Sequence, residues 1–479
     1  MDCGQITDLQ DFSDKILKLA NSIKNSDLKP WFKLDALWVF IYSKLHFLMR
    51  VGSLRLLDLK LLDQELKSIL CKSAGLPTNT LHLFIEGPSC CGCLGFPSLL
   101  MWRAAHVIAN FAHTMNDQLS PISRIARAVI MRITRTNNIE QAVDYILENA
   151  LKTRYGRPIM QNTHWSAIIV ATRTFTNLME FKLIAPKDTV HVLVGLKGES
   201  SHPLPDQQLF RNLCLSIHRV TFAGLLATSR GPVFKHLSSC STSIFSIKSG
   251  WLLNSHEWKL MLRARLDLLS LPTRQHRGFK PGLCRHCLLY PDSLTHALSL
   301  CKPRESLIIK RHDLVLWRLV RALLSTLSLT DEESAKLEKM IPTERLYVEI
   351  REGLSLYVNH EFEYWDMDKR PDLIFIDNVR KIAYVIDVQV VVEYASHSFD
   401  VARSEKVSKY QELAVFLQNR GLTVFIDAFL MGALGSFDPK NMLFLNLLKL
   451  PPLHLEYFIR FLCSKMVQQM VFLYHSYIV

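Results

Sequence analysis

The chain has 479 residues, of which 49% are hydrophobic and 21% are charged. This balance is ordinary for a globular protein with a sizeable core, and it argues against intrinsic disorder. A net charge of +13 predicts an anionic partner, with nucleic acid preferred over an acidic membrane surface. At roughly 100–200 residues per domain, the length predicts two to four domains.

The cysteines and the N-terminus indicate the cellular compartment. Eleven cysteines are scattered along the chain, and the first 15 residues are acidic and polar rather than apolar. No run approaches the roughly 18 apolar residues that a membrane span needs. These features predict a reducing, intracellular compartment without membrane attachment, in which clustered cysteines are metal ligands before they are disulfides.

The first 250 residues are predicted to be mostly helical, and a further helix is expected just beyond them. Residues 30–52 carry apolar side chains at helical spacing, and a second amphipathic helix over 53–77 ends at Gly75 and Pro77. A glycine-rich turn, CCGCLG at 90–95, precedes the next helix, and a polar loop at 197–207 is a candidate boundary. The remaining predicted helices of this part are 99–116, 120–134, 138–151, 163–184, 206–229 and 257–271.

The last 175 residues change character. Helices are expected over 305–328 and 331–358, and then the pattern favours strands. The predicted order is a strand (370–377), a turn (378–381), a strand (382–394), a helix (402–421), a strand (422–432) and an apolar helix (453–478). Strands and helices alternating in this way predict a small α/β domain.

Between these parts lies the stretch CRHCLLYPDSLTHALSLC, residues 284–301. Its cysteines and histidine have the spacing C-x2-C-x8-H-x4-C, and three thiolates with one imidazole complete a tetrahedral zinc site. Because no position stays open, the expected site is structural rather than catalytic. The alternative is buried cysteines beside a surface histidine. The predicted zinc ligands are Cys284, Cys287, His296 and Cys301.

The cluster Cys90, Cys91 and Cys93 is spaced too tightly for one tetrahedral ion, so it is interpreted as a glycine turn with buried thiols. The zinc stretch, in contrast, lies in a basic block. Residues 272–321 contain ten Lys or Arg and three acids. The block predicts contacts with nucleic-acid phosphates. The residues assigned to those contacts are Arg274, Arg277, Lys280 and Arg285.

Two carboxylates follow the basic block on the predicted hairpin. Asp372 begins one strand and Asp387 lies in the middle of the next, so both side chains could converge on one face. Paired carboxylates among apolar residues are costly unless they bind a cation, and Mg²⁺ is the natural occupant. On the following helix, Lys406, Lys409 and Tyr410 lie within one turn. A lysine there would offset charge that develops on a phosphate.

A purely structural interpretation of the same residues is also consistent with the sequence. Asp372 could cap a strand, Asp387 could pair with Arg380, and the lysines could form a solvated helix face. Asp377 lies next to the predicted turn, where an acid most often stabilises only the turn itself.

With these residues in place, the chain resembles the C-terminal part of a site-specific non-LTR retrotransposon polyprotein. Three stretches carry the resemblance in the same order. A helical part at 28–100 is similar to a reverse-transcriptase thumb. A CCHC zinc knuckle follows an LPTR turn at 271–274. A restriction-like endonuclease signature, PD…D…K, begins at Pro371. Together they cover most of residues 28–420.

The resemblance implies a fold, an activity and partners. It implies metal-dependent DNA nicking for target-primed reverse transcription, a DNA target and element RNA as partners, and Zn²⁺ and Mg²⁺ as cofactors. It also implies a nuclear protein with a cytoplasmic stage before import. Asp372 and Asp387 match the metal-binding carboxylates, Lys406 or Lys409 the catalytic lysine, and Tyr410 the neighbouring tyrosine.

Three departures from the family pattern stand out. Gln389 occupies the place, two residues after the second acid, where many restriction-like folds carry the lysine, so the lysine must come from the helix. CCGCLG replaces an acidic glycine turn. No aromatic-x-Asp-Asp polymerase signature occurs, so the palm is absent and the chain should not polymerise DNA by itself.

The expected architecture is therefore multidomain. A mostly α part fills the first two-thirds and includes a small zinc knuckle, and an α/β restriction-endonuclease-like domain follows. The alternative functions are a catalytically dead remnant that only binds RNA or DNA, and a helical interaction protein with a structural zinc. The predicted segments are an N-terminal extension (1–27), a thumb-like part (28–116), a helical linker region (117–270), the basic turn and knuckle (271–330) and the endonuclease (331–479).

Overall fold

The computed structural model describes residues 9–51, 56–117, 119–152, 164–271, 282–327, 329–340, 345–360 and 370–478. The chain forms two compact units, which are described separately. Residues 1–89 and 93–227 form the first, and residues 90–92 and 228–479 form the second. The division at 227 lies beyond the 197–207 loop that the sequence favoured, because that loop joins two paired strands of the first unit. The finer division into five segments stays a prediction.

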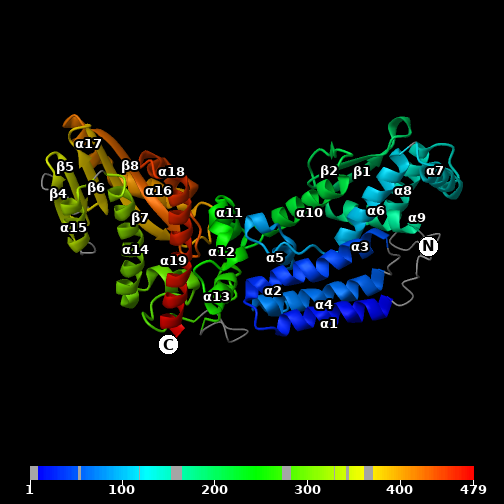
Figure 1. Cartoon of the computed structure of the whole chain (residues 1–479), viewed down its shortest axis with the longest axis horizontal. Helices are drawn as coiled ribbons and strands as arrows, with labels where there is room; N and C mark the ends of the chain where they lie inside the picture. The colour runs from blue at the N-terminus through cyan, green and yellow to red at the C-terminus, as the bar shows by residue number, and fades with distance from the viewer. Residues whose placement is uncertain are drawn as a thin grey trace. The chain divides into compact units, whose positions relative to one another are not determined.

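The first unit begins with a helical bundle (Figure 1). The expected helix over 30–52 forms, but one turn of π-helix interrupts it at Trp38–Tyr42 (η1). The expected second helix ends at Gly75, where a positive φ of 70° lets Leu76 N–H donate to Cys71 O at 2.8 Å. The helices of this bundle are α1 (Leu9–Asn25), α2 (Pro30–Leu37), α3 (Ser43–Val51), α4 (Leu56–Ala74), α5 (His82–Glu86) and α6 (Leu99–Asn116).

The rest of the first unit adds a small sheet that the sequence prediction missed. The helix expected over 163–184 ends at Leu178, and its last residues form strand β1 (Glu180–Ile184). Alternating burial of Phe181 and Leu183 explains the strand, since a period of two suits a sheet that is buried on one face. The other elements are α7 (Pro121–Thr134), α8 (Ile139–Lys152), α9 (His164–Leu178), β2 (His191–Gly195), β3 (His202–Pro203) and α10 (Leu209–Leu226).

The second unit starts with short helices that lead to the zinc-knuckle stretch. Asn254 caps one of them through a capping box with Glu257. The elements in order are α11 (Gly231–Ser238), α12 (Phe245–Ser249), α13 (Ser255–Arg265), the π turn η6 (His296–Leu300), α14 (Glu305–Leu324) and α15 (Asp331–Met340).

The helix predicted over 331–358 is wrong in its second half. Strands β4 (Leu346–Arg351) and β5 (Leu354–Val358) follow α15 and form an antiparallel hairpin. Strand β4 alternates between buried and exposed positions, and Gly353 takes a positive φ of 78° in the turn. Period-two alternation with a glycine in the turn favours a hairpin over a helix.

The hairpin extends the predicted strands into a five-stranded sheet with the order β4-β5-β6-β7-β8. The first four strands pair antiparallel, and β7 and β8 pair parallel through the helical crossover between them. The elements are β6 (Leu373–Asp377), β7 (Ile382–Val391), α16 (Ser398–Lys409), α17 (Gln411–Asn419), β8 (Thr423–Gly432), α18 (Met442–Leu447) and α19 (Pro452–Ile478).

Helices cover both faces of this sheet (Figure 1). Leu373, Phe375 and Ile386 face one core together with side chains of α14 and α19. Ile374 and Val385 face the other core together with side chains of α17. The chain is thus mostly helical with two small sheets, as the multidomain α and α/β expectation requires. In the described part of the chain, no helix is long and apolar enough to cross a membrane.

Candidate metal centres

The CCHC stretch folds as a short loop around its ligands. An isolated bridge pairs Leu283 with Pro291, and Cys284 N–H donates to Tyr290 O at 2.8 Å. His286 N–H points back to Cys284 Sγ at 3.4 Å. This backbone turn places the two thiols of the C-x2-C pair toward the π turn that carries His296.

The four predicted zinc ligands converge. Their ligand atoms all lie within 4.8 Å of one another. Zinc lies about 2.3 Å from thiolate sulfur, so two sulfurs on one tetrahedral ion lie about 3.8 Å apart. Cys284 Sγ and Cys301 Sγ are 3.8 Å apart, and Cys287 Sγ lies 3.3 Å from His296 Nε2. The cluster therefore fits a structural zinc ion.

The electrostatics of the cluster also favour a cation. Burial alone would raise the pKa of Cys284, but the Tyr477 hydroxyl and the backbone N–H groups of Cys287 and His286 lower it to about 6. Burial and the neighbouring Cys284 raise the pKa of Cys301. One thiolate thus forms readily, and the second forms only when a positive charge compensates it.

The knuckle is packed against the C-terminal helix α19. The Tyr477 hydroxyl donates to Asp292 Oδ1 at 2.5 Å, and His286 Nε2 lies 3.0 Å from Tyr477 O. The Arg304 guanidinium bonds to Leu473 O and to Ala297 O. A zinc ion here would anchor the end of the chain to the knuckle.

Only part of the basic block is available to a ligand. Arg304 and Arg311 are buried, at 5% and 1% exposure. The Arg318 guanidinium lies 3.9 Å from the ring of Phe461. Arg285 is exposed and donates to Ile478 O at 2.9 Å. The other predicted contacts, Arg274, Arg277 and Lys280, lie outside the described residues.

The two predicted carboxylates adjoin the same cross-strand pair. Strand β6 pairs with β7 so that Leu373 faces Ile386; Asp372 directly precedes Leu373, and Asp387 directly follows Ile386. Val388 N–H donates to Asp372 Oδ2 at 2.6 Å. Asp387 is 2% exposed. Burial and then the charge of Asp372 raise the pKa of Asp387, and Lys406 offsets only part of that effect.

Helix α16 brings one of the two candidate lysines to this pair. Lys406 Nζ forms an ion pair with Asp387 Oδ2. Lys409 is exposed, and its Nζ lies 4.7 Å from the centre of the Tyr410 ring. The Tyr410 hydroxyl donates to Arg370 O at 2.7 Å. Burial and the Asp387 carboxylate raise the pKa of Tyr410, so its hydroxyl stays protonated.

A buried ion-pair network fixes the orientation of α16. Arg403, one turn before Lys406, pairs with Asp427 on β8 and lies 2.9 Å from both Asp438 Oδ2 and Asn441 Oδ1. Because residues three apart share a helix face, this network directs Lys406 toward the sheet.

His312 on α14 is a site residue that the sequence prediction missed. Its Nε2 lies 3.1 Å from both Asp372 Oδ2 and Val388 O, and its Nδ1 lies 3.1 Å from Asp313 Oδ1. Burial disfavours the imidazolium, but hydrogen bonds to Asp313 and then to Asp372 outweigh it and raise the pKa of His312 to about 10. His312 and Asp372 are 60 positions apart in the sequence, so no local pattern could predict this contact.

The ion pairs of His312 with Asp313 and Asp372 should make the stability of the protein depend on pH. The pKa of His312 is raised above the ordinary value of about 6.5. The stabilisation is therefore fully present below about pH 6.5, and it is lost as the pH rises toward 10. In zinc-loaded protein without another divalent cation, His312→Gln should lower the melting temperature by a few degrees at pH 6 and much less at pH 10. Thermal unfolding across this range tests it, and a pH-independent difference would contradict it. His202→Gln, on an exposed strand of the first unit, is the control.

The residues weighed against this site behave as separate features. Asp377 stabilises its turn, since its Oδ1 accepts from Arg380 N–H at 2.8 Å and its Oδ2 lies 3.7 Å from Arg380 Nε. Arg380 therefore does not pair with Asp387. Cys93 is buried as expected, whereas Cys90 is exposed.

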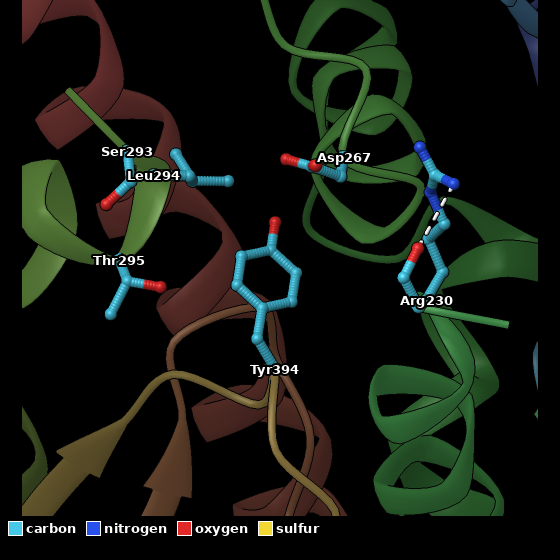
Figure 2. Close-up of a pocket in the computed structure, with 7 residues that line it drawn as sticks. Arg230, Asp267, Ser293, Leu294, Thr295 and Tyr394 are labelled. Atoms are coloured by element: carbon cyan, nitrogen blue, oxygen red, sulfur yellow. Dashed lines mark hydrogen bonds between the residues drawn. The ribbon is translucent and has the colours of Figure 1, made fainter. Parts of the chain in front are cut away.

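A polar pocket of about 130 Å³ lies beside the knuckle (Figure 2). Ser293 and Thr295, which lead into the π turn, line it together with Arg230 and Asp267. Tyr394 closes it and donates to Ala264 O at 3.0 Å. None of the predicted site residues lines this pocket.

Comparison with known family models and curated proteins identifies no relative of this chain. No known family model matches the chain, and no curated protein matches it. Its function is therefore argued from the two sites alone.

Proposed function

We propose that the chain is the C-terminal part of a retrotransposon reverse transcriptase/endonuclease of the site-specific non-LTR type, and that its second unit nicks DNA. The observation that carries this proposal is the convergence of Asp372, Asp387 and Lys406 in a PD…D…K order. Asp372 and Asp387 adjoin the same cross-strand pair, Leu373 with Ile386, and Lys406 on the next helix forms an ion pair with Asp387.

The carboxylate pair suits a divalent cation. Asp387 is buried with a raised pKa, so its charge is costly without a compensating cation. On the same strand, the buried Gln389 Oε1 receives no hydrogen bond from the described residues. A strand places residues two apart on one face, so Gln389 adds a further oxygen acceptor beside Asp387. Carboxylate and amide oxygens are ligands that Mg²⁺ accepts.

The chain's own groups have separate roles in the proposed hydrolysis. A bound Mg²⁺ would supply Lewis-acid chemistry and a more acidic water. Asp372 and Asp387 hold that ion. Lys406 carries the positive charge that offsets the charge developing on the scissile phosphate. Tyr410 stays protonated, and its hydroxyl donates to Arg370 O. This hydrogen bond supports the backbone that leads into β6.

Zinc and the basic residues would serve binding in this proposal. The knuckle holds Arg285 beside the end of α19, and the exposed Lys302, Lys310 and Arg321 follow the knuckle in the sequence. Phosphate contacts of this kind weaken steeply with salt. Target DNA and element RNA would be the partners, and the nucleus the compartment where the DNA is met.

Nicking of supercoiled plasmid tests the proposal and separates the two lysines. The zinc-loaded chain should convert plasmid to the open-circle form in Mg²⁺ or Mn²⁺ and not without them. Lys406→Ala should reduce the rate about 10²–10³-fold, because it removes a charge aimed at the transition state. Lys409→Ala should lose far less. Equal losses in the two variants would refute the assignment of Lys406.

The alternative is a catalytically dead remnant that only binds RNA or DNA. Salt-sensitive binding with about one zinc per chain, but without metal-dependent nicking, would establish that alternative. Absence of any nucleic-acid binding would instead favour a helical interaction protein with a structural zinc.

A further inference from the structure

The pocket beside the knuckle is built by four segments of the second unit that are distant in the sequence (Figure 2). Arg230 directly precedes α11, and Asp267 follows the end of α13. Thr295 leads into the π turn of the knuckle, and Tyr394 follows β7. The volume of about 130 Å³ is well below the roughly 300 Å³ at which pockets begin to hold drug-sized ligands. The pocket therefore suits one small planar group.

Arg230 keeps part of its guanidinium for a ligand. Its Nε donates to Leu266 O at 3.3 Å, and its Nη1 donates to Ser229 Oγ at 3.2 Å. Its Nη2 donates to no acceptor among the residues that the structure describes. A guanidinium that is already oriented by two hydrogen bonds is a suitable donor for a phosphate oxygen.

The other groups of the pocket suit a nucleobase. Figure 2 shows the Tyr394 ring between Thr295 on one side and Asp267 and Arg230 on the other. An aromatic ring can stack on any base, because every base has a π face. The Asp267 carboxylate accepts hydrogen bonds and donates none, so it favours a base that carries an amino group. The Thr295 hydroxyl caps no N–H of the π turn, and it can donate or accept.

We propose that this pocket binds the base of one unpaired nucleotide, with an exocyclic amine on Asp267 and the phosphate on Arg230. The inference rests on the proposed nucleic-acid function of the second unit and names what its pocket recognises. The small volume favours one ring over two, and cytosine is the pyrimidine that carries an amine. Thr295 directly precedes the zinc ligand His296, so a zinc ion would hold one wall of the pocket in place.

Binding of single-stranded DNA tests the pocket without cleavage. Fluorescence anisotropy compares oligocytidylate with oligothymidylate of about 12 nucleotides, using the zinc-loaded full chain without Mg²⁺ or Mn²⁺. The two backbones carry equal charge, so a difference in affinity reports the base. The cytosine strand should bind about fivefold more tightly or better, because thymine has an oxygen acceptor in place of the amine.

Two variants test the contacts to the base. Asp267→Asn should narrow the cytosine preference, because an amide donates as well as accepts. Asparagine tolerates the positive φ of 54° at this position. Tyr394→Leu should weaken the binding of both strands about fivefold or more, whereas Tyr394→Phe keeps the ring and should retain more of the affinity.

A third variant tests the contact to the phosphate. Arg230→Ala should weaken both strands alike and reduce the dependence of log affinity on log salt by about one. Lys248→Ala, at an exposed lysine of the second unit outside the pocket, is the matched control and should keep the cytosine preference. Zinc content and a thermal melt check the fold of each variant.

The outcomes separate the pocket from the proposed nuclease. Equal affinity for the two strands, or a cytosine preference that is undiminished in Asp267→Asn, overturns the pocket, and plasmid nicking by the unaltered protein would leave the endonuclease proposal standing. A cytosine preference that depends on Asp267 in a protein that nicks no plasmid supports the pocket and counts against the nuclease. If neither strand binds at low salt, the pocket proposal fails, and nicking decides the other proposal by itself.

Discussion

Asp387→Ala is expected to abolish plasmid nicking while the protein stays folded. Loss of outer partners of a metal site alone typically costs 10–100-fold, so loss of a direct ligand should exceed about 100-fold. The rate of open-circle formation in Mg²⁺, at protein concentrations matched by zinc content, measures the effect. If Asp387→Ala and the unaltered chain nick plasmid at equal rates, the catalytic assignment of Asp387 is wrong.

Asp387→Asn is the companion variant, because it keeps the shape of the side chain and removes the charge. The folded state raises the pKa of Asp387 above that of an unfolded aspartate. Ionisation of this group therefore works against folding as the pH rises above about 4. Asp387→Asn should consequently keep or raise the melting temperature at pH 7 while it loses nicking. A variant that loses activity only because it unfolds would instead melt early.

Substitution of one knuckle cysteine is expected to have the largest effect on stability. Cys301→Ser should reduce zinc from one ion per chain to nearly none, and it should destabilise the second unit. Structural zinc sites supply folding energy directly, with apparent binding energies of about 10–16 kcal/mol in small zinc peptides. Metal analysis and thermal unfolding measure both effects. Cys90→Ser, at an exposed cysteine outside the cluster, is the matched control and should retain zinc.

The structure predicts which segments lose stability when zinc is lost. Tyr477 and Arg304 fasten the end of α19 to the knuckle. After zinc loss, hydrogen exchange should quicken over 283–300 and also over the last turns of α19 near 470–478. Strands β6 and β7 should be affected less. Exchange that rises only within the knuckle would show that α19 does not depend on the metal.

Lower pH should release the zinc from the unaltered protein. Thiolates are the ligands, so protons compete with the ion. In the metal-free cluster, burial and Cys284 raise the pKa of Cys301, so this thiol stays protonated once zinc has left.

Much of the site could be predicted because its signals are local. The zinc ligands lie within 18 consecutive residues, and their spacing already restricts the chemistry. Asp372 and Asp387 flank a short turn, so a hairpin register brings them together without information from elsewhere. The helix boundaries near Gly75 and at 99–116 could be predicted in the same way, from helix-breaking residues close to them in the sequence.

The wrong predictions have a common physical cause. Helices and strands can have similar sequence patterns, and burial in the folded protein decides which of them forms. Residues 346–351 and 180–184 form strands because their alternating apolar side chains are buried on one face of a sheet. Two of the seven described basic residues of the basic block are buried for the same reason and do not contribute to a basic surface. Arg304 and Arg311 are basic in the sequence, yet they are buried and satisfy carbonyl and hydroxyl oxygens.

The sequence by itself determined which residue types could hold zinc and which carboxylates would adjoin one cross-strand pair, because these depend on spacing along one loop and one hairpin. Only the tertiary structure decided that Lys406 rather than Lys409 meets Asp387, since the Arg403 network sets the rotation of α16. It also placed His312 against Asp372 from a distant helix. Contacts between distant elements depend on packing, and no local period encodes them.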